Sequence, residues 1–371
     1  MGEEKRESAK VYNIVDSVKG GSGKTTFALM LSLLLDNRLT EKRENEESSV
    51  CLVDMDIQGS ALLYLLFGKS FLDGKKDGES IAYLNDRVIA VGEESDKKWD
   101  YINAFYFKDN RSSGPRTDVI LCDPRTESKK KFRSMSNQNY SPEVLYSTYR
   151  MGLGNMLSGL NGMEAYLHKH VIFDMPPNAD GYSDAVYDVL IKKEYSVMGK
   201  NDKCNLFLMS TMDKGQQLAT LDYFFEQASS ENFQKFDKIF FVFNDWCGFK
   251  EISTKTLKPD DKRGSQGIGI LDKDAPGFFT EAVLFFKDQI SKNSMICRNT
   301  IRDKIVFLGL KFDIPYYRMC TQGDGIWNND MPEGLLDPIK YLADMNTDLN
   351  NMKNTDNTER LLKILDLNNG K

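Results

Sequence analysis

The sequence predicts an α/β fold in which a mostly parallel β-sheet is flanked by helices. Three short apolar runs predict it, because each has the length of a buried strand and ends in glycine or acidic residues. They are residues 11–15, 50–54 and 171–174. Open α/β sheets bind ligands at the carboxyl ends of their strands, so the residues after each run form the candidate site.

The first run leads into a glycine-rich turn, residues 17–26, which reads SVKGGSGKTT. Glycines let backbone N–H groups converge on an anion, and a helix predicted over residues 25–35 adds the positive end of its dipole there. The predicted ligand is therefore a phosphate. The common pattern G-x-x-x-x-G-K-[ST] fails by one position, because Val18 stands at its first glycine, whereas K-G-G-x-G-K-T fits. The alternative is a glycine turn with solvated lysines.

Three side chains of this turn have predicted roles in holding a nucleotide. Lys24 would reach the β- and γ-phosphates, the Thr25 hydroxyl would ligate Mg²⁺, and Thr26 would donate to an α-phosphate oxygen. Lys19 opens the turn and cannot easily fold back onto its own phosphates. We therefore expect Lys19 to reach a nucleotide bound to a second subunit.

This turn resembles the deviant Walker A motif of the ParA/MinD family of partitioning and positioning ATPases. The resemblance implies a Rossmann-like P-loop fold, ATP and Mg²⁺ as cofactors, and an ATP-dependent homodimer. It implies Lys19 and Lys24 as catalytic residues. The nucleotide-binding residues that it implies in the turn are Gly20, Gly21, Ser22, Gly23, Lys24, Thr25 and Thr26.

The second run resembles the switch I strand of the same family, usually written D-x-D-P-Q-G. Both acids are present, and Ile57 replaces the proline. The resemblance implies that Asp56 orients or activates the attacking water and that Asp54 supports the Mg²⁺ and phosphate network. From the residues alone, an Asx turn at the strand end is the alternative.

The third run ends in Asp174 and continues into two prolines, like the D-x-P-P of the family's Walker B and switch II segment. An acid at this end of a buried strand can hold Mg²⁺ through a water. The resemblance also implies that Asn244, after the run 238–244, reads the adenine edge, and that Pro315 brackets the base. The alternative for Asn244 is a turn residue at the strand end.

Composition indicates a cytoplasmic protein. The 371 residues include 49 basic and 55 acidic side chains, for a net charge of −6, and the charged N-terminus is unlike a signal peptide. No run of eighteen apolar residues occurs. Six cysteines without a C-x-x-C pair predict reduced core thiols. His168 and His170 alternate before the third run, which favours a polar strand entrance over a metal pair.

The order of the motifs predicts one principal domain over residues 1–371, with insertions at about 69–167 and 246–304. The first insertion contains strand-like runs and a basic run, 129–133, which is either a nucleic-acid contact or a solvated loop. The second predicts a mobile loop over about 250–272 and a helix over 278–290. A charged C-terminal helix, 358–367, favours packing on the body over membrane binding.

The resemblance implies a dimerising ATPase that hydrolyses ATP to ADP and phosphate. Its expected role is plasmid or chromosome partitioning, through ATP-dependent non-specific DNA binding and a ParB-like adaptor protein. The acidic balance would confine a DNA surface to a local patch. The alternative is a regulatory or scaffold switch that positions a protein complex without DNA. A small-molecule ligase or kinase fits the paired-lysine loop less well.

Overall fold

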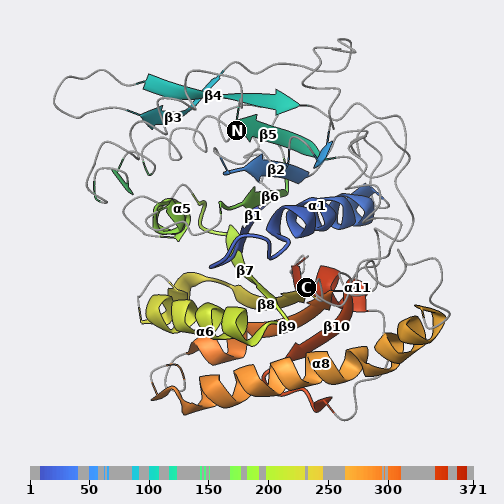
Figure 1. Ribbon diagram of the computed structural model, residues 1–371. Coiled ribbons are helices and arrows are strands. Elements are labelled where there is room, and N and C mark those ends of the chain that lie inside the picture. Colours follow the sequence, from blue (N-terminus) through green and yellow to red (C-terminus); the bar gives the residue numbers. More distant parts are fainter. Residues whose placement is uncertain are drawn as a thin grey trace, which may run out of the picture. The chain divides into compact units, whose positions relative to one another are not determined.

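The structure is a computed structural model (Figure 1). The chain divides into two compact units, which are described separately. Unit 1 comprises Met1–Val15, Thr25–Asn205 and Arg318–Met331, and unit 2 comprises Asp16–Lys24, Leu206–Tyr317 and Pro332–Lys371. The described residues are 9–40, 50–56, 62, 65–66, 86–91, 100–107, 117–122, 143, 146–147, 150, 168–176, 182–191, 198–229, 233–244, 264–294, 296, 300–310, 339–349 and 357–365.

Unit 1 contains a sheet with the strand order β1-β6-β2-β5-β4-β3. The neighbouring pairs β1–β6, β6–β2 and β2–β5 are parallel, whereas β4 is antiparallel to both β5 and β3. The sheet is thus parallel where the sequence motifs lie and antiparallel at one edge. Its strands are β1 (Val11–Asp16, whose last residue belongs to unit 2), β2 (Val50–Asp54), β3 (Asp86–Val91), β4 (Asp100–Phe107), β5 (Asp118–Cys122) and β6 (His170–Asp174).

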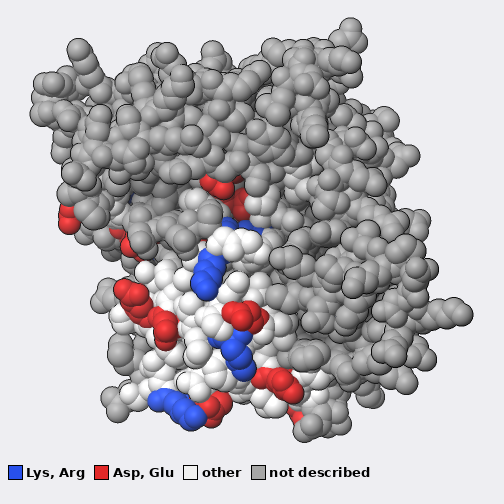
Figure 2. All heavy atoms as spheres, viewed as in Figure 1, with Lys and Arg blue, Asp and Glu red and all other residues white. Residues whose placement is uncertain are grey.

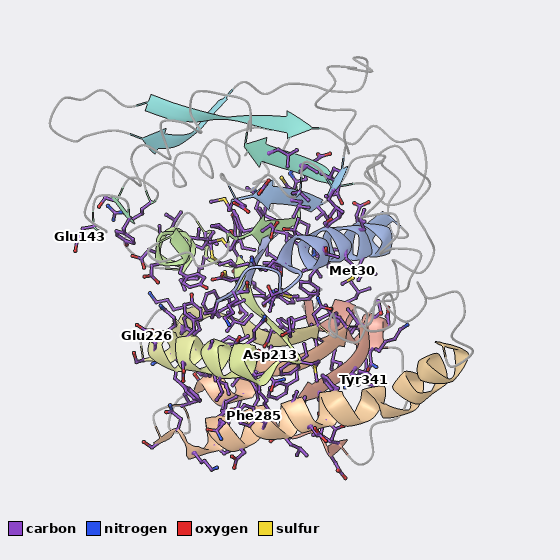
Figure 3. All side chains as sticks on the ribbon, viewed as in Figure 1. Met30, Glu143, Asp213, Glu226, Phe285 and Tyr341 are labelled. Atoms are coloured by element: carbon purple, nitrogen blue, oxygen red, sulfur yellow. The ribbon has the colours of Figure 1, made fainter. Side chains whose placement is uncertain are left out.

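Two helices of unit 1 follow its motif-bearing strands. Helix α1 (Lys24–Thr40) begins at the end of the glycine turn, and α5 (Tyr182–Ile191) follows β6. The apolar side chains of α1 from Phe27 to Leu35, among them Met30, which Figure 3 labels, are buried, as expected of a helix inside a core. Thr117, just before β5, donates its hydroxyl hydrogen to Ser32 of α1 over 3.2 Å, so α1 packs against the sheet of unit 1.

Unit 2 contains the strand order β7-β8-β9-β10, in which β8 and β9 are parallel and β10 is antiparallel to β9. The strands are β7 (Lys203–Thr211, which begins in unit 1), β8 (Lys238–Asn244), β9 (Ile305–Leu310) and β10 (Ile339–Asp344). The helices are α6 (Lys214–Ala228), α8 (Gly264–Lys292), α11 (Asn357–Leu365) and two 3₁₀ turns, η2 (Phe233–Lys235) and η3 (Thr300–Lys304).

Aromatic rings fill the core of unit 2. Phe241 of β8 lies 5.0 Å from Phe224 of α6 and 4.9 Å from Phe286 of α8, measured between ring centroids. Both helices therefore cover the same face of the sheet. The two helices also touch each other, because the Lys214 ammonium of α6 lies 3.8 Å from the centroid of Phe285 on α8 (Figure 3).

The two segments predicted as insertions contribute regular structure. Strand-like runs in the first form β3 and β5. In the second, α8 begins at Gly264, so the prediction of a mobile loop is wrong from that residue onward. Glycines and Pro276 argue locally against a helix, but helix growth is cooperative and extends from the turns that bury Phe279 and Phe286. The run 129–133 and Pro315 lie outside the described residues.

The C-terminal helix α11 packs on the sheet of unit 2. Its residues Leu361 and Leu365 are buried, and Asn357 donates its amide to the carbonyl of Lys340 in β10 over 2.6 Å. In the ranges that the structure describes, no helix combines the length and the apolar character needed to cross a bilayer.

Candidate nucleotide-binding site

The glycine turn has the backbone conformation that its sequence requires. Gly21 has φ +78° and Gly23 has φ +91°, both in the left-handed region that favours glycine. A Cβ atom built on Gly23 would lie 2.4 Å from Nδ2 of Asn244, whereas one on Gly21 would meet nothing within 4 Å. Gly21 is therefore required by backbone conformation alone, and Gly23 by conformation and by close packing.

The ammonium group of Lys24 lies inside the turn. Lys24 is only 7% exposed, and its Nζ donates to Oγ of Ser17 over 2.9 Å. The Ser17 hydroxyl in turn donates to the carbonyl of Lys19 over 2.8 Å. The Lys19 side chain is exposed. The two lysines of the motif therefore differ, because one is held within the turn and the other is accessible to a second molecule.

Ser22 supplies a test of whether a phosphate fits the turn. It is 1% exposed, and within the described part of the chain its hydroxyl has no hydrogen-bond partner. A buried polar group left in this state costs about 1–3 kcal/mol. A phosphate oxygen would accept from this hydroxyl and from the N–H groups at the start of α1. The residues of the turn therefore fit a phosphate group.

Asn244 ends β8 and contacts the turn directly. It is 1% exposed, and its Nδ2 donates to the carbonyl of Ser22 over 3.1 Å. The contact of Asn244 with an adenine edge stays a prediction. The position of Asn244 beside Ser22 was not predicted, because the two residues are 222 positions apart.

The acids of the second and third motifs lie together in unit 1. Asp54 and Asp174 are buried and are register partners in the neighbouring strands β2 and β6. Level residues of parallel strands point to the same face, and two ionised carboxylates there repel each other. A divalent cation would relieve that repulsion, and carboxylate oxygens are ligands that Mg²⁺ prefers. Thr25, the third predicted ligand, also belongs to unit 1.

The Asx turn considered for the D-x-D segment is present. Oδ1 of Asp54 accepts the backbone N–H of Asp56 over 2.9 Å, and Asp56 is half-buried. This bond fixes the backbone at Asp56 directly after the strand. The role of the Asp56 carboxylate in orienting or activating the attacking water stays a prediction.

Asp16 is a site residue that the sequence analysis missed. It is buried at the end of β1, where Oδ1 accepts the N–H of Ser17 over 2.7 Å and Oδ2 accepts the hydroxyl of Tyr223 over 3.4 Å. Asp16 thus connects α6 to the turn. The signal was available, because an acid that follows an apolar run also marks Asp54 and Asp174.

The two histidines and the cysteines Cys51 and Cys204 lie near the amino ends of their strands, away from the acids described above. Nε2 of His168 is 2.8 Å from Oδ2 of Asp118, at the amino ends of β6 and β5, and both are buried. Among the described residues, no three His, Cys, Asp or Glu form a metal-binding group. Cys51 and Cys204 are both buried. Burial, with the Asp118 carboxylate adding to it, raises the pKa of Cys51 well above its usual value.

Charged side chains of both signs are mixed on the described part of the face that Figure 2 shows. In the face shown by Figure 2, lysine or arginine and acidic side chains alternate among uncharged residues. The described part of this face therefore shows no surface of one sign that would bind a polyanion.

The chain is similar in structure to ParA, McdA and MinD-type ATPases. The pNOB8 ParA structure matches with 11% identity over 80% of this chain and 75% of that one, at a TM-score of 0.41. Cyanothece apo McdA matches with 13% identity over 85% of this chain and 91% of that one, at a TM-score of 0.37. Pyrococcus horikoshii MinD, complexed with Mg-ADP, matches with 15% identity over 63% of this chain and 70% of that one, at a TM-score of 0.32.

No protein-family model and no curated protein sequence matches the chain. At the identities and TM-scores of the structural matches, the function has to be argued from the residues of this chain.

Proposed function

We propose that this chain is a ParA-like ATPase that binds ATP with Mg²⁺ and hydrolyses it to ADP and phosphate. The observation that carries the proposal is the glycine turn before α1. It has two glycines with positive φ, the buried ammonium of Lys24 and a buried Ser22 hydroxyl that a phosphate oxygen would satisfy. This combination suits an anion better than it suits a turn with solvated lysines.

The residues of the turn would bind the phosphates, and the acids would hold the metal. Backbone N–H groups and Lys24 supply positive charge where phosphoryl transfer spreads negative charge over the phosphate oxygens. Thr25, Asp54 and Asp174 would hold Mg²⁺, which when bound would neutralise charge on the β- and γ-phosphates. Asp56 would orient the attacking water.

Lys19 would complete the site of a second copy of the chain. Its exposed side chain at the start of the turn supports this assignment. The test is the variant Lys19→Ala. Its ATP binding is measured by titration, and its dimerisation is measured by light scattering. We expect ATP binding to persist while ATP-dependent dimerisation and hydrolysis are lost. A variant that dimerises on ATP and hydrolyses it at the normal rate would exclude the trans role.

The proposed cellular role is plasmid or chromosome partitioning in the cytoplasm, with non-specific DNA binding by the ATP-bound dimer and a ParB-like adaptor as activator. Retention of the chain on DNA that needs ATP and falls with rising salt would support this role. A scaffold switch without DNA binding is the second candidate. The net charge of −6 favours it, and ATP-dependent dimers that leave DNA unbound at low salt would support it.

ATP binding itself is best tested with two lysine variants. Lys24→Ala removes the buried ammonium of the turn. Lys292→Ala is the matched control, because Lys292 is exposed on α8 and pairs with Asp288. Titration calorimetry with ATP and Mg²⁺ should show binding by the wild type and by Lys292→Ala, and its loss in Lys24→Ala. Equal binding by all three would refute the proposed site.

A further inference from the structure

We infer that Asn244 is a positioning residue of the phosphate-binding turn, which acts on the nucleotide through the backbone of Ser22 and Gly23 and not through the base. The inference rests on the proposed function, because it assigns a role within the same site. Asn244 and residues 16–24 all belong to unit 2.

The hydrogen bond between Asn244 and Ser22 is buried and directed at the main chain. Nδ2 donates to the Ser22 carbonyl over 3.1 Å, and each of the two residues is 1% exposed. Water cannot readily replace the amide at such a site. Removing the donor therefore leaves a buried carbonyl unsatisfied, which costs about 1–3 kcal/mol.

Gly23 carries a second, independent sign of the same role. A Cβ atom there would lie 2.4 Å from Nδ2 of Asn244, closer than any real contact. The turn is thus packed directly against the amide at the residue that precedes Lys24. With φ +91°, Gly23 also has a backbone conformation that side-chain-bearing residues rarely adopt, and the Asn244 amide lies directly beside it.

Strand β8 holds the amide in place. Asn244 is the register partner of Leu310, and the preceding residue, Phe243, is buried. The Phe243 ring lies 4.9 Å from Phe286 of α8 and 6.4 Å from Phe307 of β9, measured between centroids. A side chain carried by a packed strand holds its partner more accurately than one carried by a loop.

This role predicts a ligand dependence that base recognition does not. An amide that shapes the turn affects every ligand whose phosphates bind there, whether or not the ligand has a base. An amide that reads adenine affects ATP and leaves a ligand without a base unchanged. Inorganic tripolyphosphate separates the two roles.

The experiment compares ATP and inorganic tripolyphosphate, each with Mg²⁺, by titration calorimetry on the full chain. Asn244→Ala should weaken both ligands by the same factor, about tenfold, which corresponds to about 1.4 kcal/mol. Asn357→Ala is the matched control, because Asn357 is also a buried amide that donates to a backbone carbonyl, that of Lys340. It should leave both affinities unchanged.

Two results would overturn the inference. One is a weakened affinity for ATP with unchanged affinity for tripolyphosphate, which would make Asn244 a base reader. The other is the same loss in Asn357→Ala, which would make the effect one of general stability. If Asn244→Ala does not fold, Asn244→Leu replaces the amide with an apolar side chain of similar shape and serves in its place.

Amide hydrogen exchange separates failure of this inference from failure of the proposed function. Without any ligand, Asn244→Ala should speed exchange in the peptide that covers residues 16–24, and Asn357→Ala should not. A wild type that binds neither ligand but shows this difference would refute the nucleotide site and retain the role of Asn244. Unchanged exchange in Asn244→Ala would overturn that role.

Discussion

Each unit holds its own candidate ligand-binding residues, and the two units do so in different ways. In unit 1, strand register alone brings Asp54 level with Asp174. In unit 2, side chains hold the turn, since Asn244 binds the Ser22 carbonyl and Ser17 binds Lys24. The proposed metal ligands of unit 1 therefore depend on the sheet as a whole. The turn of unit 2, which is the proposed phosphate site, depends on single side chains and is the more sensitive to substitution.

The cores of the two units also differ, in the number of large side chains that are fully buried. Among the described residues, the aromatic side chains that are at most 2% exposed include four in unit 1 and nine in unit 2, and those of unit 2 are all phenylalanine. The unit 1 set is Tyr12, Phe27, Phe173 and Tyr187, and the unit 2 set is Phe207, Phe224, Phe233, Phe236, Phe240, Phe241, Phe243, Phe286 and Phe307. Asn244 therefore lies at the end of a strand, β8, whose phenylalanine rings are packed in the core of unit 2.

The largest expected effect is on stability and compares one phenylalanine from each unit. Phe241→Ala should cost about 3–5 kcal/mol of unfolding free energy. Phe173→Ala should cost about 1 kcal/mol less, because aromatic pairs add about 0.5–1.5 kcal/mol each. Phe173 stacks on Tyr12 at 6.5 Å, whereas Phe241 contacts Phe224 and Phe286 at 5.0 and 4.9 Å. Urea denaturation measures both, and equal losses would contradict the contrast.

The next effect compares two glycines of the turn. Gly21→Ala should weaken ATP binding about tenfold, because a left-handed alanine costs about 1–2 kcal/mol. Gly23→Ala should weaken it at least about 100-fold, since its Cβ would also displace Asn244. Titration with a fluorescent ATP analogue measures both. Equal affinities would mean that the packing against Asn244 has no consequence for the ligand.

A third effect tests the metal-binding half. Asp174→Asn should leave ATP binding without Mg²⁺ unchanged or improved and should reduce the gain in affinity that Mg²⁺ provides, by about tenfold. The reason is that a neutral amide attracts the cation less and repels the phosphates less. Calorimetric titrations with ATP, in EDTA and in Mg²⁺, measure the affinity without the metal and the gain that the metal provides. A gain from Mg²⁺ as large as in the wild type would exclude Asp174 as a ligand.

The smallest effect is a pH dependence within unit 2. Burial raises the pKa of Asp344, but hydrogen bonds from Thr347 and Asn346 outweigh it and leave the pKa below its usual value. Asp344 therefore stabilises the fold above its unfolded pKa of about 3.9, and this contribution is lost as pH falls through the folded value. Urea denaturation from pH 6 to 3 should show a shallower loss in Asp344→Asn. An identical slope would contradict this assignment.

The elements that carry the motifs were predictable because each is a short buried run that ends in a polar signal. β1, β2, β6, β8 and the start of α1 lie where their apolar runs predict them. The contact between Asn244 and Ser22 was not predictable, since it depends on tertiary packing across 222 positions. The first turns of α8 were missed because glycines and Pro276 locally oppose a helix. Asp16 was missed although its position at the end of a strand resembles that of Asp54.

Release of phosphate from ATP labelled at the γ-position tests the central claim most directly. We expect slow release by the wild-type chain in the presence of Mg²⁺, unchanged release in Lys292→Ala, and loss of at least about 100-fold in Lys24→Ala. Circular dichroism would confirm that both variants fold. Release at the same rate in Lys24→Ala, or none from a folded wild type that also fails to bind ATP, would contradict the proposal that this turn is the site of an ATPase.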